Sequence, residues 1–353
     1  MLLIMRSKNI PALLLCFVLV LSACKKEKAP PVSPPPPVIQ APPPFGFYVV
    51  GYFPSYQNLA DIPDQKFRMC NVVNYAFFAV NSNGTLNVPN TSQVQQFIAR
   101  ARANNSKPFV SINEAAAGNF KNMAATAGGR TAFVKDVMAK VRQFGFDGVD
   151  VDWEFPRTDD GTHLTFTALM KELSDSLHLG AKYYLTAALT AGKYGGAIRD
   201  AIQNEVFGYA DWFNIMAYDD FSTTAPYRHH SDYNLAVTCL NYWLNTRGMP
   251  AKKCVLGLPG YGRASGITQS GTTMAYRNIL ARGGSHLSDS AVVTTTAFPN
   301  GYTIYYNGQP TVKNKTMLAV QRANGVMLWE KWHDAHDSRS LLKAVCDTIG
   351  RPY

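Results

Sequence analysis

Short runs of apolar, β-branched and aromatic residues recur along the chain beyond about residue 45, and stretches with helical spacing of their apolar positions separate them. A short continuous apolar run between turn signals is typical of a strand that is buried on both faces, as in a parallel sheet. Eight runs fit this description, and they span residues 47–53, 72–80, 107–112, 146–155, 183–189, 212–218, 254–261 and 325–330.

The stretches between these runs have the apolar spacing of amphipathic helices. Strands that alternate with helices predict parallel βα units, and eight such units fit a closed (β/α)8 TIM barrel better than an open doubly wound sheet. Residues 263–324, between the seventh and eighth strands, form a longer connection than the others, so we expect a short excursion there. The clearest helices cover residues 92–103, 131–144, 163–179, 234–247 and 338–349.

The first residues have the layout of an export signal. Arg6 and Lys8 precede an apolar run at residues 10–21, and small residues lead to Cys24. This run is shorter than the ~20 residues that a membrane-spanning helix needs. Leu-Ser-Ala-Cys also resembles the bacterial lipobox, which implies cleavage before Cys24 and attachment of lipid to its sulfur. We therefore expect an exported bacterial lipoprotein that is located in the cell envelope or anchored to the outer membrane.

The residues that follow Cys24 are rich in proline. The sequence KKEKAPPVSPPPPVIQAPPP favours extended polyproline II segments without a packed core, as in a tether. The sequence thus divides into a signal peptide at residues 1–23, a lipidated cysteine with its linker at 24–44, and a catalytic domain at 45–353.

Charge gives little support for a nucleic-acid partner. The formal net charge is +10, and removal of residues 1–23 takes away Arg6 and Lys8 and no acid, so 10 − 2 leaves +8. Beyond the lysines at 25, 26 and 28, the basic residues are scattered and form no compact run or nucleic-acid motif.

Four cysteines remain in the expected mature domain. Cys70, Cys239, Cys254 and Cys346 show no CxxC spacing, so the sequence does not indicate a zinc site. Export would permit disulfide pairing, but Cys254 opens an apolar run and reads equally well as a small buried side chain. Their pairing stays open.

The fourth predicted strand carries a row of acids. In FDGVDVDWEFP, Asp150, Asp152 and Glu154 lie two residues apart and so share one face, while valines and Trp153 occupy the other. Neighbouring members of the row are ~6.6 Å apart in an ideal strand. Like charges in a low-dielectric barrel interior raise at least one pKa, so one acid is expected to hold a proton at neutral pH.

This row has a chemical use. Glu154 lies nearest the carboxyl end of its strand, where barrel enzymes place their chemistry, and it can protonate a leaving oxygen. Asp152 would hold or share that proton. An ion-binding strand is the alternative, but calcium loops have a different spacing. On the sixth strand, Met216 and Tyr218 share one face and can line the same pocket.

The residues around the acidic row resemble those of family 18 glycoside hydrolases, chitinases in particular, and the resemblance extends from residue 47 to the end. Asp147 to Glu154 match the DxxDxDxE signature. The other matching elements are the MxYD-like Met216-Ala217-Tyr218-Asp219, the GxPxYGR-like Gly257 to Arg263, Trp329 on the eighth strand, Tyr52 on the first, and Tyr75-Ala76-Phe77-Phe78 on the second.

The resemblance implies retaining hydrolysis with substrate assistance, in which the acetamido oxygen of the sugar attacks its own anomeric carbon. It implies that Glu154 is the general acid and then the base, that Asp152 orients the acetamido group, and that Asp150 supports Asp152. Tyr218 would hydrogen-bond the acetamido oxygen. The mechanism uses no metal or cofactor.

The same resemblance implies the substrate contacts. They are expected from Tyr52, Phe78, Met216 and Asp219, with Trp329 as the floor of the subsite. Asp147, on the opposite face of its strand, is expected to be structural. The partner would be a polysaccharide or glycan that contains N-acetylglucosamine, such as chitin, cleaved at β-1,4 linkages.

One feature leaves the substrate open. The third strand of the family usually ends in SxGG, whereas this chain has Ser111-Ile112-Asn113-Glu114, so the pocket there is expected to differ. The alternatives are an endo-β-N-acetylglucosaminidase acting on N-glycans and a non-hydrolytic glycan-binding lipoprotein, although such relatives typically lose the acid. His333-x-x-His336, with Asp334 and Asp337, is expected to be a solvated loop without metal.

Overall fold

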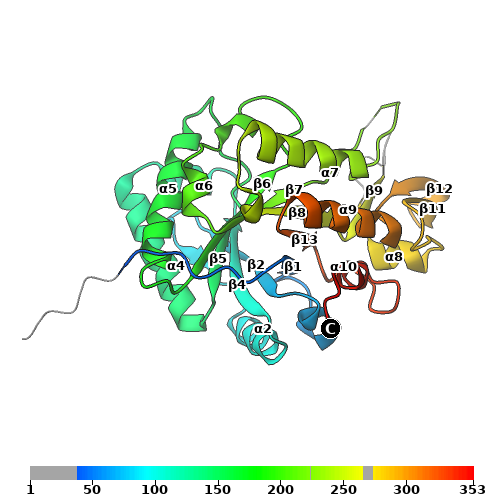
Figure 1. The fold of residues 1–353 in the computed structure, drawn as a ribbon, viewed down its shortest axis with the longest axis horizontal. Helices are drawn as coiled ribbons and strands as arrows, with labels where there is room; N and C mark the ends of the chain where they lie inside the picture. Colours follow the sequence, from blue (N-terminus) through cyan, green and yellow to red (C-terminus); the bar gives the residue numbers. More distant parts are fainter. Residues whose placement is uncertain (1–37, 223, 265–272) are drawn as a thin grey trace, which may run out of the picture. The chain divides into compact units, whose positions relative to one another are not determined.

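The computed structural model describes residues 38–222, 224–264 and 273–353, and the strands within them form a closed parallel barrel (Figure 1). β1 pairs with β13 on one side and with β2 on the other, which closes the ring. The predicted TIM barrel is confirmed. Its eight strands are β1 (Tyr48–Pro54), β2 (Val72–Val80), β4 (Lys107–Glu114), β5 (Gly148–Val151), β6 (Tyr184–Thr190), β7 (Trp212–Met216), β8 (Cys254–Pro259) and β13 (Gly325–Trp329), with β3 (Leu86–Asn87) added antiparallel to β2.

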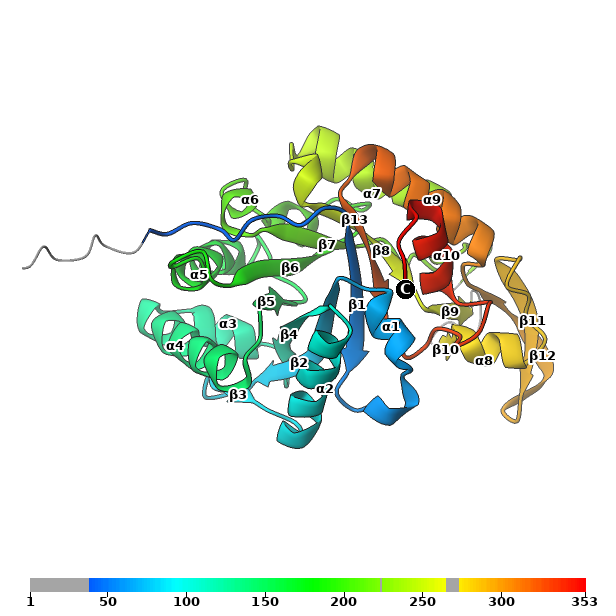
Figure 2. The ribbon, with the colours of Figure 1, turned by 60° about the horizontal axis from the view of Figure 1, so that its bottom comes forward.

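Helices cover the outside of the barrel, as Figure 2 shows from a second direction. The predicted helices are present, with ends that differ from the prediction. The helix predicted at residues 234–247 is α-helical in its first half and continues as a π-helical turn, η3 (Asn241–Thr246). The α-helices around the barrel are α1 (Asp64–Arg68), α2 (Thr91–Ala103), α3 (Asn119–Ala124), α4 (Ala127–Phe144), α5 (Thr162–Leu177), α6 (Val206–Tyr209), α7 (Tyr233–Leu240), α9 (Gln309–Arg322) and α10 (Leu341–Ile349), with 3-10 turns η1 (Leu59–Asp61), η2 (Arg199–Ala201) and η4 (Ala251–Lys253).

The expected excursion between β8 and β13 is a small α+β unit. Four strands, β9 (Tyr261–Ala264), β10 (Thr273–Ala275), β11 (Ser290–Thr295) and β12 (Phe298–Tyr305), form an antiparallel sheet in the order β10-β9-β12-β11. The helix α8 (Tyr276–Ala281) follows β10. The chain then returns to the barrel through α9. The sequence analysis did not predict this helix.

Aromatic rings fill the amino-terminal end of the barrel. Tyr48 stacks on Trp212 with ring centroids 4.3 Å apart, and Phe109 lies 5.5 Å from Trp212. Phe45 packs edge-on against Tyr48 at 5.2 Å. Because these rings occupy the barrel interior at this end, polar chemistry is confined to the opposite end of the strands.

The last residues of the predicted linker lie against the barrel. Ile39 forms an isolated β-bridge with Leu179, and the Gln40 amide donates to the carbonyl of His178 at 3.0 Å. Tyr184 donates from its hydroxyl to the Pro43 carbonyl at 2.8 Å. The packed part of the chain therefore begins before residue 45. The signal peptide and Cys24 lie outside the described residues, within which no helix has the length and apolar character to span a bilayer.

The four cysteines of the domain all carry free, buried thiols.

The loop after β13 is less exposed than expected. Asp334 is fully buried, whereas the sequence analysis placed it in a solvated loop. Its burial follows from a pairing that the sequence pattern cannot reveal, because the partner, Lys66, lies 268 positions earlier in the chain.

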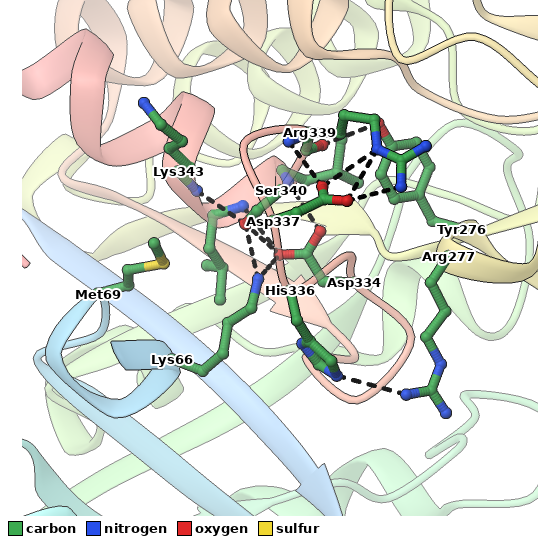
Figure 3. A network of polar contacts seen from close by, with 12 residues as sticks. Lys66, Met69, Tyr276, Arg277, Asp334, His336, Asp337, Arg339, Ser340 and Lys343 are labelled. Carbon is green, nitrogen blue, oxygen red and sulfur yellow. Dashed lines mark hydrogen bonds and ion pairs between the residues drawn. The ribbon is translucent and has the colours of Figure 1, made fainter. Parts of the chain in front are cut away.

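Lys66 and Asp334 form a buried ion pair where the two ends of the domain meet (Figure 3). Ser340 links them: its hydroxyl accepts from Lys66 at 2.6 Å and lies 2.7 Å from Asp334. Asp334 also accepts from the amides of Leu341 and Leu342, at the start of α10. The pair thus joins α1, after the first strand, to α10, after the last.

The remaining polar residues of this loop contact separate partners. Asp337 pairs with Arg339, His333 lies 2.9 Å from Glu330, and His336 lies 3.4 Å from Arg277. Across the ranges that the structure covers, no cluster of three or more His, Cys, Asp or Glu side chains could hold a metal ion.

We predict that Lys66→Met lowers the free energy of unfolding by about 3–5 kcal/mol, because the Asp334 carboxylate stays buried without its charge partner. Urea denaturation followed by circular dichroism measures this change. Lys121→Met is the control, because its partner Asp160 is solvent-accessible, and it should leave the urea midpoint unchanged. Equal midpoints for both variants would contradict a structural role for the buried pair.

Candidate active site

The acidic row lies at the carboxyl-terminal end of the barrel, as its spacing predicts. β5 is shorter than expected and ends at Val151, although the Asp152 amide still donates to the Ile112 carbonyl at 2.8 Å. Trp153 points to the opposite side, where it stacks on Phe120 with ring centroids 5.0 Å apart. The alternation therefore separates the acids from the apolar side chains.

Asp150 lies in a polar layer inside the barrel and is fully buried. Ser111 and Thr186 are its register partners on the neighbouring strands, so their hydroxyls lie at the same height. Burial raises the pKa of Asp150, and the hydrogen bonds to the carboxylate oppose that rise. The donors are Thr186 Oγ1 at 2.5 Å, Tyr52 Oη at 2.7 Å, Ser111 Oγ at 2.8 Å and Asn214 Nδ2 at 3.1 Å.

Asp152 and Glu154 are adjacent carboxyl groups that line the same pocket and interact electrostatically. Burial and the negative charges of Glu154 and Asp150 raise the pKa of Asp152 well above its usual value. Burial and the charge of Asp219 also raise the pKa of Glu154. Both shifts disfavour the state in which the two carboxyls are ionised together, which is the direction that the sequence predicts.

A pocket of about 240 Å³ surrounds this pair. The Trp329 ring stacks on Phe77 with centroids 5.5 Å apart, and Tyr52 meets Trp329 edge-on at 5.5 Å. Most of the predicted site residues are brought together here. The lining residues are Tyr52, Phe77, Asn113, Glu114, Asp152, Glu154, Ala188, Met216, Tyr218, Asp219, Met327 and Trp329.

Phe78 was predicted to line the pocket and contact substrate, and this prediction is wrong. It is fully buried on the helix-facing side of β2, against Phe144 and Phe146. The ladder between β2 and β4 shifts register between Ala76 and Phe78, so Phe77 is an extra residue. This bulge reverses the alternation, and Phe77 takes the position in the pocket.

A second pocket of about 530 Å³ adjoins the first. Glu154, Met216, Tyr218 and Asp219 line both pockets, so the acid stands where the two meet. The loop after β6 forms much of the second pocket, with residues 193–199 along its wall. The two pockets give space for a ligand on both sides of Glu154.

Asp219 is fixed by several donors. Tyr261 donates to its Oδ1 at 2.7 Å, and Arg263 pairs with both oxygens. His230 Nδ1 lies 3.5 Å from Oδ1. Although burial opposes it, hydrogen bonds from these groups and the charge of Arg263 hold the pKa of Asp219 below its usual value. Asp219 therefore places a stable negative charge beside Glu154.

Several of these supporting residues received no role in the sequence analysis. Ser111 and Thr186 could have been found by aligning the inward positions of adjacent predicted strands with Asp150. His230, fully buried beside Asp219, has no such signal, because it lies in an irregular segment between β7 and α7.

Asp147 lies outside the pockets and pairs with Arg102 at 2.9 Å, a position that fits the structural role expected for it.

At the unusual end of the third barrel strand, Asn113 and Glu114 both line the smaller pocket. Glu114 accepts from the Phe120 amide at 3.0 Å. Side chains therefore occupy a wall where the family pattern has glycines.

The arrangement suits acid–base chemistry on a neutral ligand. Glu154 combines a raised pKa with access to both pockets, as a general acid requires. The other carboxyls are engaged: Asp150 by four donors, Asp152 by Glu154, and Asp219 by Arg263 and Tyr261. The aromatic wall of the smaller pocket offers a flat apolar surface for a sugar ring.

Comparisons with known proteins agree with this site. The model for glycosyl hydrolases family 18 matches residues 48–334. Chitinase C of Streptomyces lividans is 30% identical over 221 residues, which cover 52% of this chain but only 35% of that protein. Endochitinase 1 of Metarhizium anisopliae is 27% identical, with 87% of this chain and 84% of that protein covered.

A chitinase structure from Bacteroides thetaiotaomicron has the same fold, with a TM-score of 0.74, 23% identity, and coverage of 88% of this chain and 99% of that chain. The family match includes every strand of the barrel and the acidic row. The chain therefore belongs to glycosyl hydrolases family 18.

Proposed function

We propose that the protein hydrolyses β-1,4 linkages next to N-acetylglucosamine in chitin or chitooligosaccharides, with retention of configuration and assistance from the substrate. The carrying observation is that the adjacent carboxyls of Asp152 and Glu154 line one pocket together with Tyr218 and Trp329. A retaining two-carboxylate enzyme needs a free anionic nucleophile. Asp152, with its raised pKa and its contact to Glu154, is a poor candidate for that role, so the nucleophile comes from the substrate.

The proposed reaction has two steps. Glu154 gives its proton to the glycosidic oxygen as the bond from that oxygen to C1 breaks, and the acetamido oxygen of the same sugar bonds to C1. Water then attacks C1 of the oxazolinium, Glu154 takes a proton from it, and the C1 configuration is retained. A shared proton lets Asp152 change partner, from Glu154 to the acetamido nitrogen, as charge develops.

The surrounding residues support this proposal. Tyr218 lines the same pocket as the acidic pair. Among the residues that the structure describes, its hydroxyl has a single weak contact of 3.9 Å, to the Met327 sulfur, which leaves it available to the acetamido oxygen. Trp329 offers a flat face to the sugar. The names of the relatives, Chitinase C and Endochitinase 1, favour chitin as substrate.

We predict that the domain from residue 38 cleaves chitohexaose and that Glu154→Gln lowers kcat by about 10²–10⁴-fold, because the amide cannot donate the acid proton. Mass spectrometry of the products measures both. Glu172→Gln, on the outer helix α5, is the matched control and should retain full activity.

A high-mannose glycoprotein incubated in parallel separates the alternatives. Cleavage of the glycoprotein alone would assign the enzyme to N-glycans, and binding of chitohexaose without cleavage of either substrate would identify a glycan-binding protein. Proton NMR of the first product anomer tests retention. The β-anomer is expected, and the α-anomer would reject substrate assistance.

We predict that Asp219→Asn moves the alkaline limb of the kcat/KM profile to lower pH. The Asp219 charge helps to raise the pKa of Glu154, so its removal lowers that pKa, and the acid then loses its proton at lower pH. Asp175→Asn, in an exposed pair with Lys171 on α5, should leave the profile unchanged. An unshifted limb in Asp219→Asn would show that this charge does not tune the acid.

We also infer from the sequence of residues 1–44 that Cys24 carries a lipid that holds the enzyme at the cell envelope. Metabolic labelling with an alkyne fatty acid in a bacterial host should mark the full chain, and Cys24→Ser should abolish the label and release the protein from the membrane fraction. Label retained by Cys24→Ser would refute this anchor.

A further inference from the structure

Lys315 is a fully buried lysine outside the pockets of the active site. It lies on α9, the helix that follows the small antiparallel sheet. Its Nζ donates to the Ser231 carbonyl at 2.7 Å, to Asn307 Oδ1 at 2.8 Å and to Ser231 Oγ at 2.9 Å. An ammonium group has three N–H donors, and these acceptors use all of them.

Ser231 connects this lysine to the end of β7. Its hydroxyl donates to the Ala217 carbonyl at 2.7 Å. Asn307 strengthens the same anchor by donating to the Ser231 carbonyl at 2.6 Å. Two hydrogen bonds thus lead from Lys315 to the residue directly before Tyr218 and Asp219.

The chain between Ala217 and Ser231 leaves the barrel and returns to it. Its two ends are also joined by the Asp220 amide, which donates to the His230 carbonyl at 2.9 Å. His230 packs with its ring 5.2 Å from that of Tyr261 and lies beside Asp219. The placement of Tyr218 and Asp219 therefore depends on where the returning end is held.

Asp219 needs this support because its backbone has φ of +65°. That left-handed conformation is unfavourable for a residue with a Cβ and persists only where neighbouring contacts impose it. His230, at the returning end of the segment between β7 and α7, contacts both the amide and the carboxylate of Asp219 through its Nδ1.

We propose that Lys315 is a positioning residue for the active site: through Ser231 it holds the end of β7 and the returning segment together, and thereby keeps Tyr218 and Asp219 at the pocket. A lysine suits this role because no shorter or apolar side chain supplies three donors at one point. Burial lowers the pKa of Lys315 to about 7 and so disfavours its charged form, whereas the three acceptors favour that form. The activity readout of this proposal rests on the function proposed above, whereas the exchange readout does not.

The test compares Lys315→Met with Lys313→Met, which makes the same change on the exposed face of the same helix. Hydrogen exchange by mass spectrometry should show faster exchange in Lys315→Met for peptides that contain the Asp220 amide, which donates to the His230 carbonyl, and the Ser231 amide, which donates to His229 Nδ1. Peptides from β4 and β5 should keep their protection. Unchanged exchange around residues 217–231 would overturn the proposal, whatever substrate the enzyme has.

Kinetics with chitohexaose provide the second readout. We expect Lys315→Met to raise the activation free energy by about the net contribution of one hydrogen bond. This lowers kcat about tenfold with little change in KM, whereas Lys313→Met should match the parent. Equal kcat values for the two variants would overturn the inference. Absence of cleavage by the parent would instead overturn the proposed function and leave the exchange result to decide on Lys315.

Ser231→Ala provides a route that keeps Lys315 in place. It removes the hydroxyl that links Lys315 to Ala217, so its kcat should fall to a similar extent. If the lysine acts through Ser231, the double variant should be no slower than the slower single variant, since both break one link. If the losses in kcat of the two single variants multiply in the double variant, Lys315 does not act through Ser231. Should Lys315→Met fail to fold, Ser231→Ala alone decides the question.

Discussion

The burial of the Asp150 carboxylate is the constraint around which the active site is built. A charge inside a barrel is tolerated only where donors replace water, and here four do so from four other strands. Ser111 and Thr186 must stand in register with Asp150, and Tyr52 must reach across the interior. Because its oxygens are occupied in this way, Asp150 leaves Asp152 to interact with Glu154, and the polar layer orders the chemistry above it.

The interior of the barrel therefore changes character along its axis. Below Asp150, stacked rings such as Tyr48 and Trp212 exclude water and set a low dielectric. Above it, the pair of Asp152 and Glu154 opens into pockets. The acids are thus held between an apolar base and an accessible mouth, and this partial burial raises their pKa values while substrate can still reach Glu154.

Regular periodicity explains what could be predicted from sequence. Apolar runs identified the eight barrel strands, and the period of two placed the acids on one face and Trp153 on the other. The prediction fails where periodicity is interrupted or contacts are remote. The bulge beside Phe77 moved Phe78 out of the pocket, Asp334 is buried by a lysine from the other end of the domain, and His230 reaches Asp219 from an irregular segment.

The long connections are where this chain can differ from its relatives without losing the barrel. The polar layer comes from strands, and Glu154 follows the end of β5 by three residues, so strand register leaves little freedom for either. Tyr218 and Asp219, in contrast, stand at the start of an irregular segment whose return is anchored by α9, beyond the small antiparallel sheet. A change in that sheet or helix can therefore reach the pocket through Ser231. This route to the pocket leaves every residue of the acidic row in place.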